Sequence, residues 1–263
     1  MDILIAFLII LAIALIVGVL LLVCSHFFYV AENPQKKIIR ECLPGINCGA
    51  CGYKGCDDYA EALANGGVKP NLCAPGGKAT VEMIGDILGV KAEAPKNTVA
   101  FVACNGHCDA TFKTAEYRGI RTCAAASMLY GGDNSCSFGC LGLGDCASAC
   151  PADAICLADG IARIDASRCM SCGLCVSTCP KHIISLIPKQ TEPVVMCSNT
   201  QKGVSAKKAC KNACIGCKKC EKTCPNGAIT VINSLASVDY TKCSSCGACA
   251  GECPTGCLKN VFF

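Results

Sequence analysis

One long apolar block opens the chain, and short segments of mixed polarity follow it. Residues 3–23 consist of aliphatic side chains together with Ala, Phe and one Gly, and none of them is charged. As a helix this run would span about 30 Å, the thickness of a bilayer hydrocarbon core. The only charge before it is Asp2, whereas basic residues follow from Lys36 onward. A cleaved signal peptide would begin with a basic stretch, so the pattern predicts a retained single-pass anchor in the inner (cytoplasmic) membrane, with the body of the chain in the cytoplasm.

The polar stretch after the anchor predicts connecting chain and then two helices. Residues 27–41 are predicted to form a short polar tether. Residues 57–64, with acidic residues in the first turn, predict one helix, and residues 79–88, with apolar residues along one face and Gly89 as a stop, predict another. Residues 91–97, which include a Pro, are predicted to be a linker.

The remainder of the chain contains an internal repeat. Residues 98–104 resemble residues 192–197, and each stretch leads into a cysteine run that ends in Cys-Pro and continues with Ala-Ile. When the two copies are aligned without gaps, four cysteines of the first copy coincide with four of the second. The pairs are Cys136 with Cys210, Cys140 with Cys214, Cys146 with Cys220, and Cys150 with Cys224. One position of the alignment does not match, because Leu143 of the first copy is aligned with Cys217 of the second. Each copy continues into a further cysteine run, so we predict two tandem modules of the same kind.

The 29 cysteines among 263 residues indicate either a disulfide scaffold or a metal protein. Because this number is odd, at least one cysteine would remain unpaired in a disulfide scaffold. Where three cysteines lie within seven residues, they are too close to cross-link distant segments. We therefore predict metal ligands in a reducing compartment.

The net charge of +4 is unevenly distributed. Residues 191–263 contain nine Lys and four acidic residues, so this part carries +5. Such a basic surface suggests an acidic partner, although a solvated lysine-rich face would have the same composition. Aromatic residues make up 5% of the chain and no nucleic-acid motif is present, so nucleic acid is not expected as a partner.

Three cysteine runs have the spacing Cys-x2-Cys-x2-Cys-x3-Cys-Pro. Their cysteines are Cys169, Cys172, Cys175 and Cys179; Cys214, Cys217, Cys220 and Cys224; and Cys243, Cys246, Cys249 and Cys253. Zinc sites usually use two cysteine pairs separated by a loop, and this spacing gives zinc too many ligands too close together. The runs match the bacterial ferredoxin run residue for residue, and residues 131–263 resemble a two-[4Fe–4S] ferredoxin twice over.

The ferredoxin resemblance implies ligand sets, because the fourth cysteine of each run in such proteins ligates the cluster of the other run. In the second module one set would be Cys214, Cys217, Cys220 and Cys253, and the other Cys224, Cys243, Cys246 and Cys249. In the first module one set would be Cys150, Cys169, Cys172 and Cys175.

The companion site of the first module would use Cys140, Cys146 and Cys179 and lacks a cysteine at Leu143. Cys136 is the nearest replacement, which gives the spacing Cys-x3-Cys-x5-Cys. The alternative is that this site is lost and the two modules hold three clusters.

A fourth pattern, Cys48-x2-Cys51-x4-Cys56-x16-Cys73, precedes the repeat. Interspersed glycines would let the backbone fold closely around a cluster. The pattern resembles a small helical [4Fe–4S] domain found in a corrinoid iron–sulfur protein subunit and in the B subunit of the Rnf complex. The Rnf complex is a membrane-bound ferredoxin:NAD oxidoreductase that pumps ions.

The family of this Rnf subunit is the one that joins all these parts in this order. The resemblance implies an α+β chain with an N-terminal transmembrane helix, a small helical [4Fe–4S] domain and two tandem two-cluster ferredoxin-like modules. The expected domains are residues 1–26, 27–96, 97–190 and 191–263. It also implies a translocase subunit that relays electrons from soluble ferredoxin into flavin-bearing membrane subunits while Na⁺ or H⁺ is moved outward. Shorter members have one ferredoxin module, so which module meets the donor stays open.

Five [4Fe–4S] clusters are expected, and nine cysteines are left over. Cys156 and Cys257 follow Cys-Pro turns on short strands and are predicted to be small core residues. A sixth cluster could be held by Cys104, Cys108 and Cys123 with Cys197 or Cys210. Alternatively, these are buried thiols where two related strands pair.

No catalytic residues are expected on this chain. It has no Ser/His/Asp order, paired carboxylates or phosphate-binding loop, and Gly142-x-Gly144-x-x-Ala147 lies between proposed cluster ligands rather than after a strand. The alternative functions are a membrane-tethered polyferredoxin serving a hydrogenase or other dehydrogenase, a corrinoid-protein-like methyl-transfer component, and a structural cysteine-rich protein without iron.

Overall fold

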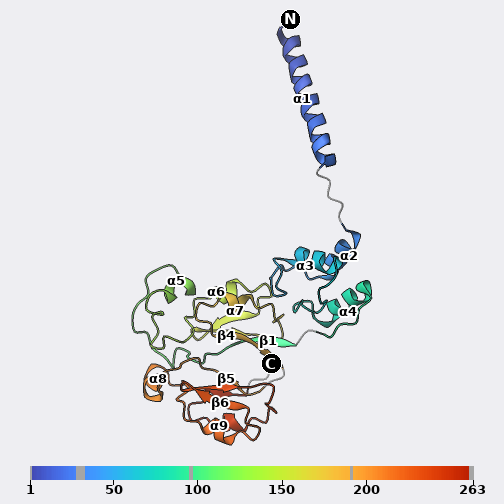
Figure 1. Cartoon of the computed structure of the whole chain (residues 1–263). Coiled ribbons are helices and arrows are strands. Elements are labelled where there is room, and N and C mark those ends of the chain that lie inside the picture. Colours follow the sequence, from blue (N-terminus) through green and yellow to red (C-terminus); the bar gives the residue numbers. More distant parts are fainter. Residues whose placement is uncertain (1, 28–32, 95–96, 190–191, 261–263) are drawn as a thin grey trace.

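The computed structural model describes residues 2–27, 33–94, 97–189 and 192–260. In Figure 1 a long helix stands apart from a folded body, in which a group of helices is followed by two regions of short strands and short helices. The chain is therefore of mixed helix and strand content.

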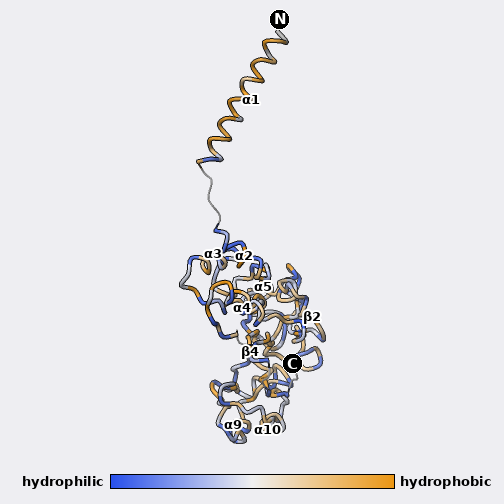
Figure 2. Tube along the Cα trace, turned by 90° about the vertical axis from the view of Figure 1, so that its right-hand side faces the viewer, coloured by the Kyte–Doolittle hydropathy of each residue, from blue (hydrophilic) through white to orange (hydrophobic). Residues whose placement is uncertain are grey.

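Helix α1 (Asp2–Phe27) is apolar along most of its length, as its hydrophobic colouring in Figure 2 shows, and only its end next to the body is coloured hydrophilic. Its part Phe7–Phe27 is long and apolar enough to cross a membrane, and none of it is buried against the rest of the described chain. At 1.5 Å per residue these 21 residues extend about 31 Å, which matches the hydrocarbon core of a bilayer. The helix fits a single-pass anchor.

Three helices make up what we call the helical segment (residues 33–94). They are α2 (Pro34–Cys42), α3 (Cys56–Ala64) and α4 (Gly77–Leu88). Their shared core contains Ile39, Tyr59 and Ile84, each at most 1% exposed. The two predicted helices are confirmed as α3 and α4, and Gly89 ends α4 in the left-handed conformation (φ 67°).

The prediction of a polar tether was wrong from Pro34 onward, because this part is helix α2; residues 28–32 lie outside the described residues. The Asn33 side chain accepts a hydrogen bond from the Gln35 backbone N–H (3.0 Å), and Pro34 occupies the first helical turn. Both are established ways to begin a helix. Of the predicted linker, residues 91–94 form no helix or strand.

The first cysteine segment (residues 97–189) contains four strands in two antiparallel pairs. The strands are β1 (Thr98–Val102), β2 (Ile155–Ala158), β3 (Ile161–Ile164) and β4 (Ile184–Pro188). The outer strands β1 and β4 pair with Ala100 opposite Leu186, and the inner strands β2 and β3 form a hairpin.

The second cysteine segment (residues 192–260) has the same pairing. Its strands are β5 (Val194–Val195), β6 (Ile229–Ile232), β7 (Leu235–Val238) and β8 (Leu258–Lys259). The outer strands β5 and β8 pair, and β6 and β7 form the inner hairpin.

Short helices connect the strands, and all of them except α8 carry a cysteine. They are α5 (Cys123–Ser127), α6 (Asp145–Ser148), α7 (Leu174–Thr178), α8 (Gly203–Ala209), α9 (Lys219–Thr223) and α10 (Ala248–Gly251). Helices α6, α7, α9 and α10 each follow a residue in the left-handed conformation and bear a buried cysteine at their second position. The sharp turn before each helix brings that cysteine inward.

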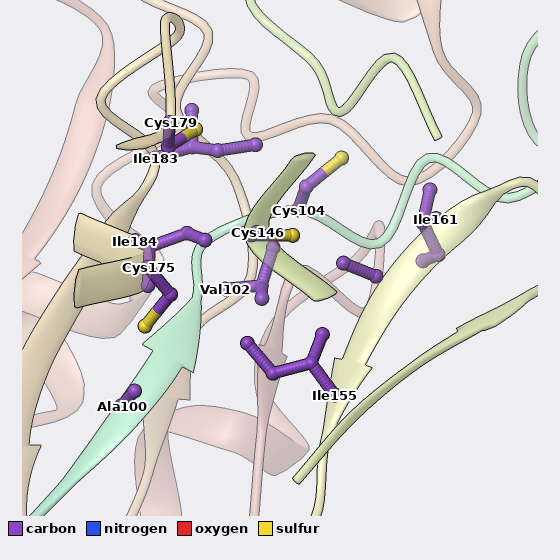
Figure 3. Packing of buried hydrophobic residues seen from close by; sticks show 11 residues of the cluster. Ala100, Val102, Cys104, Cys146, Ile155, Ile161, Cys175, Cys179, Ile183 and Ile184 are labelled. Carbon is purple, nitrogen blue, oxygen red and sulfur yellow. The ribbon is translucent and has the colours of Figure 1, made fainter. Parts of the chain in front are cut away.

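Thiols are part of the core of the first cysteine segment. Figure 3 shows Cys104, Cys146 and Cys175 among the aliphatic side chains of β1 to β4. A further cluster joins the two cysteine segments, with Val99 and Phe101 of β1 packed together with Val194 and Met196. The cysteine segments therefore share buried surface.

Candidate metal centres

All 29 cysteines are free thiols. Those that are exposed are Cys24, Cys108, Cys156, Cys217 and Cys246, and the others are buried or half-buried. The prediction of Cys156 as a core residue was wrong, since β2 turns it outward, whereas Cys257 is only 1% exposed.

The thiols of Cys48, Cys51, Cys56 and Cys73 lie together in the helical segment. Burial raises the pKa of Cys73, and the other three thiols add to this rise electrostatically. The Tyr59 hydroxyl donates to the Lys69 carbonyl (2.8 Å) and accepts from the Leu72 N–H (3.3 Å), which ties the loop before Cys73 to α3. The loop and α3 thus enclose the group of thiols.

The first cysteine segment encloses two cavities of about 20 Å³ each. The cysteines that line one of them are Cys150, Cys169, Cys172 and Cys175. Backbone N–H groups point at these sulfurs: the Ala154 N–H donates to Cys150 Sγ (3.3 Å) and the Ala100 N–H to Cys169 Sγ (3.5 Å). Burial raises the pKa of Cys175 to about 11, and the three neighbouring thiols add to the rise.

The second cavity of this segment is lined by Cys123, Cys140, Cys146 and Cys179. The structure brings Cys123 to this set in the place where the spacing had suggested Cys136, which does not line the cavity. Burial raises the pKa of Cys146 to about 12, and the thiols of Cys140, Cys123 and Cys179 contribute.

The Asp145 carboxylate holds Cys123 in position. It accepts hydrogen bonds from the backbone N–H groups of Cys123 (2.8 Å) and Ala124 (3.0 Å), and it begins α6, which carries Cys146. The first turn of α5 is thereby fixed to the first turn of α6. Nothing in the spacing signals this, because 16 residues separate Cys123 from Cys140.

Gly142 and Gly144 shape the loop that connects two cysteines of this site. Both have left-handed backbone conformations (φ 69° and 93°) in the loop between Cys140 and Cys146. A side chain at Gly142 would collide with the backbone of Gly160 in the β2–β3 turn. These glycines serve the cysteine loop, and within the described stretch 97–189 no strand leads into them as a dinucleotide site would require.

The second cysteine segment holds two further groups. A cavity of about 10 Å³ is lined by Cys214, Cys217, Cys220, Cys253 and Cys257. The sulfurs of Cys253 and Cys257 are 3.6 Å apart, and the hydrogen bond with Cys257 lowers the pKa of Cys253 to about 4.

The other group contains Cys224, Cys243, Cys246 and Cys249. Burial raises the pKa of Cys249, and the thiols of the other three cysteines add to the rise. The Ala228 N–H donates to Cys224 Sγ (3.3 Å), at the position that Ala154 occupies in the first cysteine segment.

Four more cysteines, Cys104, Cys136, Cys197 and Cys210, line a cavity between the two cysteine segments. Across the part of the chain that the structure describes, no group of three or more His, Cys, Asp or Glu side chains is arranged to hold a single metal ion. The thiols instead surround small cavities, and backbone N–H groups point at several sulfurs. This arrangement fits a polynuclear cluster held at its corners.

Three family models match parts of the chain. The model described as "Putative Fe-S cluster" matches residues 43–75, "4Fe-4S binding domain" matches residues 162–185, and "4Fe-4S dicluster domain" matches residues 213–257. These matches and the thiol groups define the class: an iron–sulfur protein with ferredoxin-type domains.

The chain is similar to named proteins over nearly its whole length. It is 40% identical over 247 residues to the B subunit of the Na(+)-translocating ferredoxin:NAD(+) oxidoreductase complex of Acetobacterium woodii, a match that covers 94% of this chain and 74% of the relative. It is 42% identical over 253 residues to the proton-translocating counterpart of Clostridium ljungdahlii (95% and 89%). It is 38% identical over 247 residues to the B subunit of the ion-translocating oxidoreductase complex of Methanosarcina acetivorans (92% of each). The chain belongs to the family of B subunits of the ion-translocating ferredoxin:NAD oxidoreductase, or Rnf, complexes.

Proposed function

We propose that this chain relays electrons from reduced ferredoxin toward NAD, as a membrane-anchored subunit of a complex that couples this flow to translocation of Na⁺ or H⁺. Membership of the B-subunit family supports this role over that of a polyferredoxin serving a hydrogenase. The chain needs no bond-making residue of its own. Its work is to bind clusters, space them and set their reduction potentials.

Five [4Fe–4S] clusters account for most of the cysteines. The ligand sets are Cys48, Cys51, Cys56 and Cys73; Cys150, Cys169, Cys172 and Cys175; Cys123, Cys140, Cys146 and Cys179; Cys214, Cys217, Cys220 and Cys253; and Cys224, Cys243, Cys246 and Cys249. The first set belongs to a helical domain (27–96), and the others belong in pairs to two tandem ferredoxin-like modules (97–190 and 191–263).

The succession of thiol groups along the body carries this proposal. The Cys172 thiol has a pKa raised by burial first and then by neighbouring thiols, among them Cys48 of the helical segment. Likewise, Cys175 of one set contributes to the raised pKa of Cys146 in the next. Clusters in these places would be close neighbours, which one-electron transfer requires.

The charges around the apolar helix support the sidedness. Asp2 is the first residue of the helix, and Lys36, Lys37 and Arg40 follow the helix, a distribution that favours the cytoplasmic side for the body. There the chain would meet soluble ferredoxin on one side and the flavin-bearing membrane subunits on the other.

Iron and sulfide analysis of the full-length chain, purified without oxygen, tests the proposal together with its reduction by ferredoxin. At least about 20 irons per chain are expected, since each cluster holds four. Reduced ferredoxin should bleach the cluster absorbance. Replacement of Cys172 and Cys175 by Ser should remove about four irons and slow ferredoxin-dependent NAD reduction by the complex.

Cys156→Ser is the matched control, because this exposed thiol lies in the same segment outside every group. It should change neither iron content nor rate. A folded chain that is colourless and poor in iron would overturn the proposal.

A further inference from the structure

The cavity between the two cysteine segments is lined by five cysteines. Cys140 belongs to a set of the first cysteine segment, and the other four, Cys104, Cys136, Cys197 and Cys210, are used by none of the five proposed clusters. Its volume, about 20 Å³, equals that of the two cavities enclosed by cysteine sets in the first cysteine segment. Three of the four cysteines are at most 8% exposed, and Cys197 is half-buried. By number of thiols, enclosure and size, this site matches those already described.

The internal repeat relates the four cysteines as two equivalent pairs. Cys104 comes two residues after β1, and Cys197 comes two residues after β5. Cys136 aligns with Cys210 in the gap-free alignment of the repeats. Each cysteine segment therefore contributes the same two ligand positions, and the site is complete only where the two segments meet.

Hydrogen bonds to sulfur obey the same symmetry. Cys104 Sγ accepts from the N–H two residues further on (3.4 Å) and from the Cys140 N–H (3.4 Å). Cys197 Sγ accepts from the N–H two residues further on (3.4 Å) and from the Cys214 N–H (3.3 Å). Cys140 and Cys214 are themselves equivalent in the repeat. Paired N–H donors at sulfur stabilise thiolates that ligate iron and tune the cluster potential.

Two further contacts bring the remaining sulfurs into the site. A Cβ at Gly106 would lie 3.5 Å from Cys104 Sγ and 3.6 Å from Cys210 Sγ, so these sulfurs of opposite segments are no farther apart than the sum of the two distances. The Asn199 side chain, 1% exposed, donates to Cys136 Sγ (3.6 Å), again across the boundary between the segments.

The chemistry of the cavity favours an iron–sulfur cluster over the alternatives. Zinc would draw four sulfurs to about 2.3 Å from one point, and no such convergence on a single ion exists among the described residues. The free thiols also exclude a disulfide in this structure.

We propose that Cys104, Cys136, Cys197 and Cys210 ligate a sixth [4Fe–4S] cluster at the junction of the two cysteine segments. This inference rests on the proposed function and extends it, because the junction cluster would allow electron transfer between the clusters of the two cysteine segments. Cys140 and Cys214, which donate N–H groups to its sulfurs, belong to the cysteine sets on either side. One electron at a time would pass: a neighbouring cluster is oxidised by one electron, the junction cluster is reduced by one, and no proton or bond is transferred.

The test is the iron and sulfide content of the full-length chain, purified and reconstituted without oxygen. Six cubes give about 24 irons per chain, whereas five give about 20. The variant Cys136→Ser/Cys210→Ser should lose about four irons and four sulfides. Cys108→Ser is the matched control, because Cys108 lies in the same loop as Cys104 yet is exposed and outside the cavity, and its iron content should be unchanged.

A milder variant guards against misfolding. Cys197→Ser alone removes one ligand at the half-buried corner and should convert the junction cluster to a three-iron form, with its own EPR signal in the oxidised state. The other cluster signals should be unaffected.

The failures are distinguishable. About 20 irons in the native chain, unchanged by Cys210→Ser, would overturn the sixth cluster and leave the five intact. About 22 irons would overturn the four-iron assignment in favour of a two-iron cluster. A folded chain without iron would overturn the proposed function itself.

Discussion

At the scale of single residues, Cys123 and Cys136 show how tertiary structure decides between cysteines that spacing alone ranks differently. Cys136 lies four residues before Cys140, and Cys123 lies far from any run. Yet the Asp145 carboxylate holds the first turn of α5 beside α6, which brings Cys123 into the cavity with Cys140 and Cys146. Cys136 faces the cavity at the junction instead.

A double variant tests whether these two cysteines serve different clusters. Both cysteines are buried, so each of Cys123→Ser and Cys136→Ser should cost a whole cluster of about four irons, unlike Cys197→Ser at its half-buried corner. The double variant should remove about eight irons, because separate clusters are lost independently. Iron and sulfide analysis of the anaerobic protein measures this. If both cysteines ligated one cluster, the double variant would lose no more than either single one.

The tight runs were predictable because they are local. Three cysteines within seven residues can reach one cluster whatever the rest of the fold does, so their spacing is informative by itself. The cysteines that complete a site from a distance depend on packing. Cys104 and Cys197 enter the junction cavity from the ends of two strands, and their positions in the sequence are compatible with a sixth cluster and equally with buried thiols.

The Asn199 side chain leads to a prediction about the reduction potential of the junction cluster rather than about the iron content of the chain. Its amide donates to Cys136 Sγ, and such a bond stabilises the more negative, reduced cluster. Asn199→Ala should therefore lower the reduction potential of the junction cluster by about 40 mV, since a net hydrogen bond of roughly 1 kcal/mol corresponds to this shift for one electron. A redox titration followed by EPR measures the shift.

The iron content of Asn199→Ala should equal that of the native chain. Gln201→Ala is the control in the same loop, because Gln201 is exposed and contacts Asn199 rather than the sulfur. A shift of the same size in Gln201→Ala would assign the effect to the loop and contradict the role of Asn199.

At the scale of elements, α2 shows why a predicted tether became a helix. Only one side chain of α2, Ile39, is fully buried, so the apolar residues of this stretch are too few to predict a helix from their spacing. Two ion pairs with α3 complete the packing: Lys36 with Glu61 (2.7 Å) and Arg40 with Asp57 (2.9 Å). These contacts between separate stretches of chain leave no periodic signal. Helices α3 and α4 were predictable because local charges and a terminal glycine mark their ends.

Ile39 offers a test of how far α2 supports the cysteine group of the helical segment. Ile39→Ala removes a side chain that is 0% exposed and should lower the local free energy of opening by about 2–5 kcal/mol. Hydrogen exchange of the amides in α2 and α3, measured on the iron-loaded chain, reports this opening.

The neighbouring residue supplies the control for that variant. Ile38 is 50% exposed on the same helix, so Ile38→Ala should change exchange little. Equal losses in the two variants would contradict the role of Ile39 packing against α3 and α4, because Ala has a higher helix propensity than Ile and the exposed substitution should cost nothing.

At the scale of the whole molecule, the helical segment, the first cysteine segment and the second cysteine segment follow one another in the body (Figure 1), and each contains cysteine groups. The repeat was visible in the sequence, and so were its runs. The joining of the two segments was not, because it depends on contacts such as the Ser198 hydroxyl donating to the Ala103 carbonyl (2.8 Å) and the Lys211 N–H donating to the Ala110 carbonyl (2.9 Å).

We propose that ferredoxin docks at the second cysteine segment. The exposed Cys217 precedes two exposed lysines, Lys218 and Lys219, and this part of the chain carries the excess of positive charge. An electron entering here would meet an exposed cluster corner next to a basic surface. An acidic ferredoxin would be drawn to that surface by long-range attraction.

Neutralising this surface should slow electron entry without changing the clusters. The docking variant replaces Lys207, Lys208, Lys211, Lys218 and Lys219 by Gln, and the control variant replaces the exposed Lys54, Lys69 and Lys91 of the helical segment by Gln. Stopped-flow reduction by ferredoxin should be roughly tenfold slower in the docking variant at low salt, and the difference should vanish near 1 M salt, where the Debye length is about 3 Å. The control variant should react at close to the native rate, and iron content should be native in both. Equal rates and equal salt dependence in the docking variant and the native chain would place ferredoxin on a different surface, because removal of five positive charges from a true docking face cannot leave the encounter rate unchanged at low ionic strength.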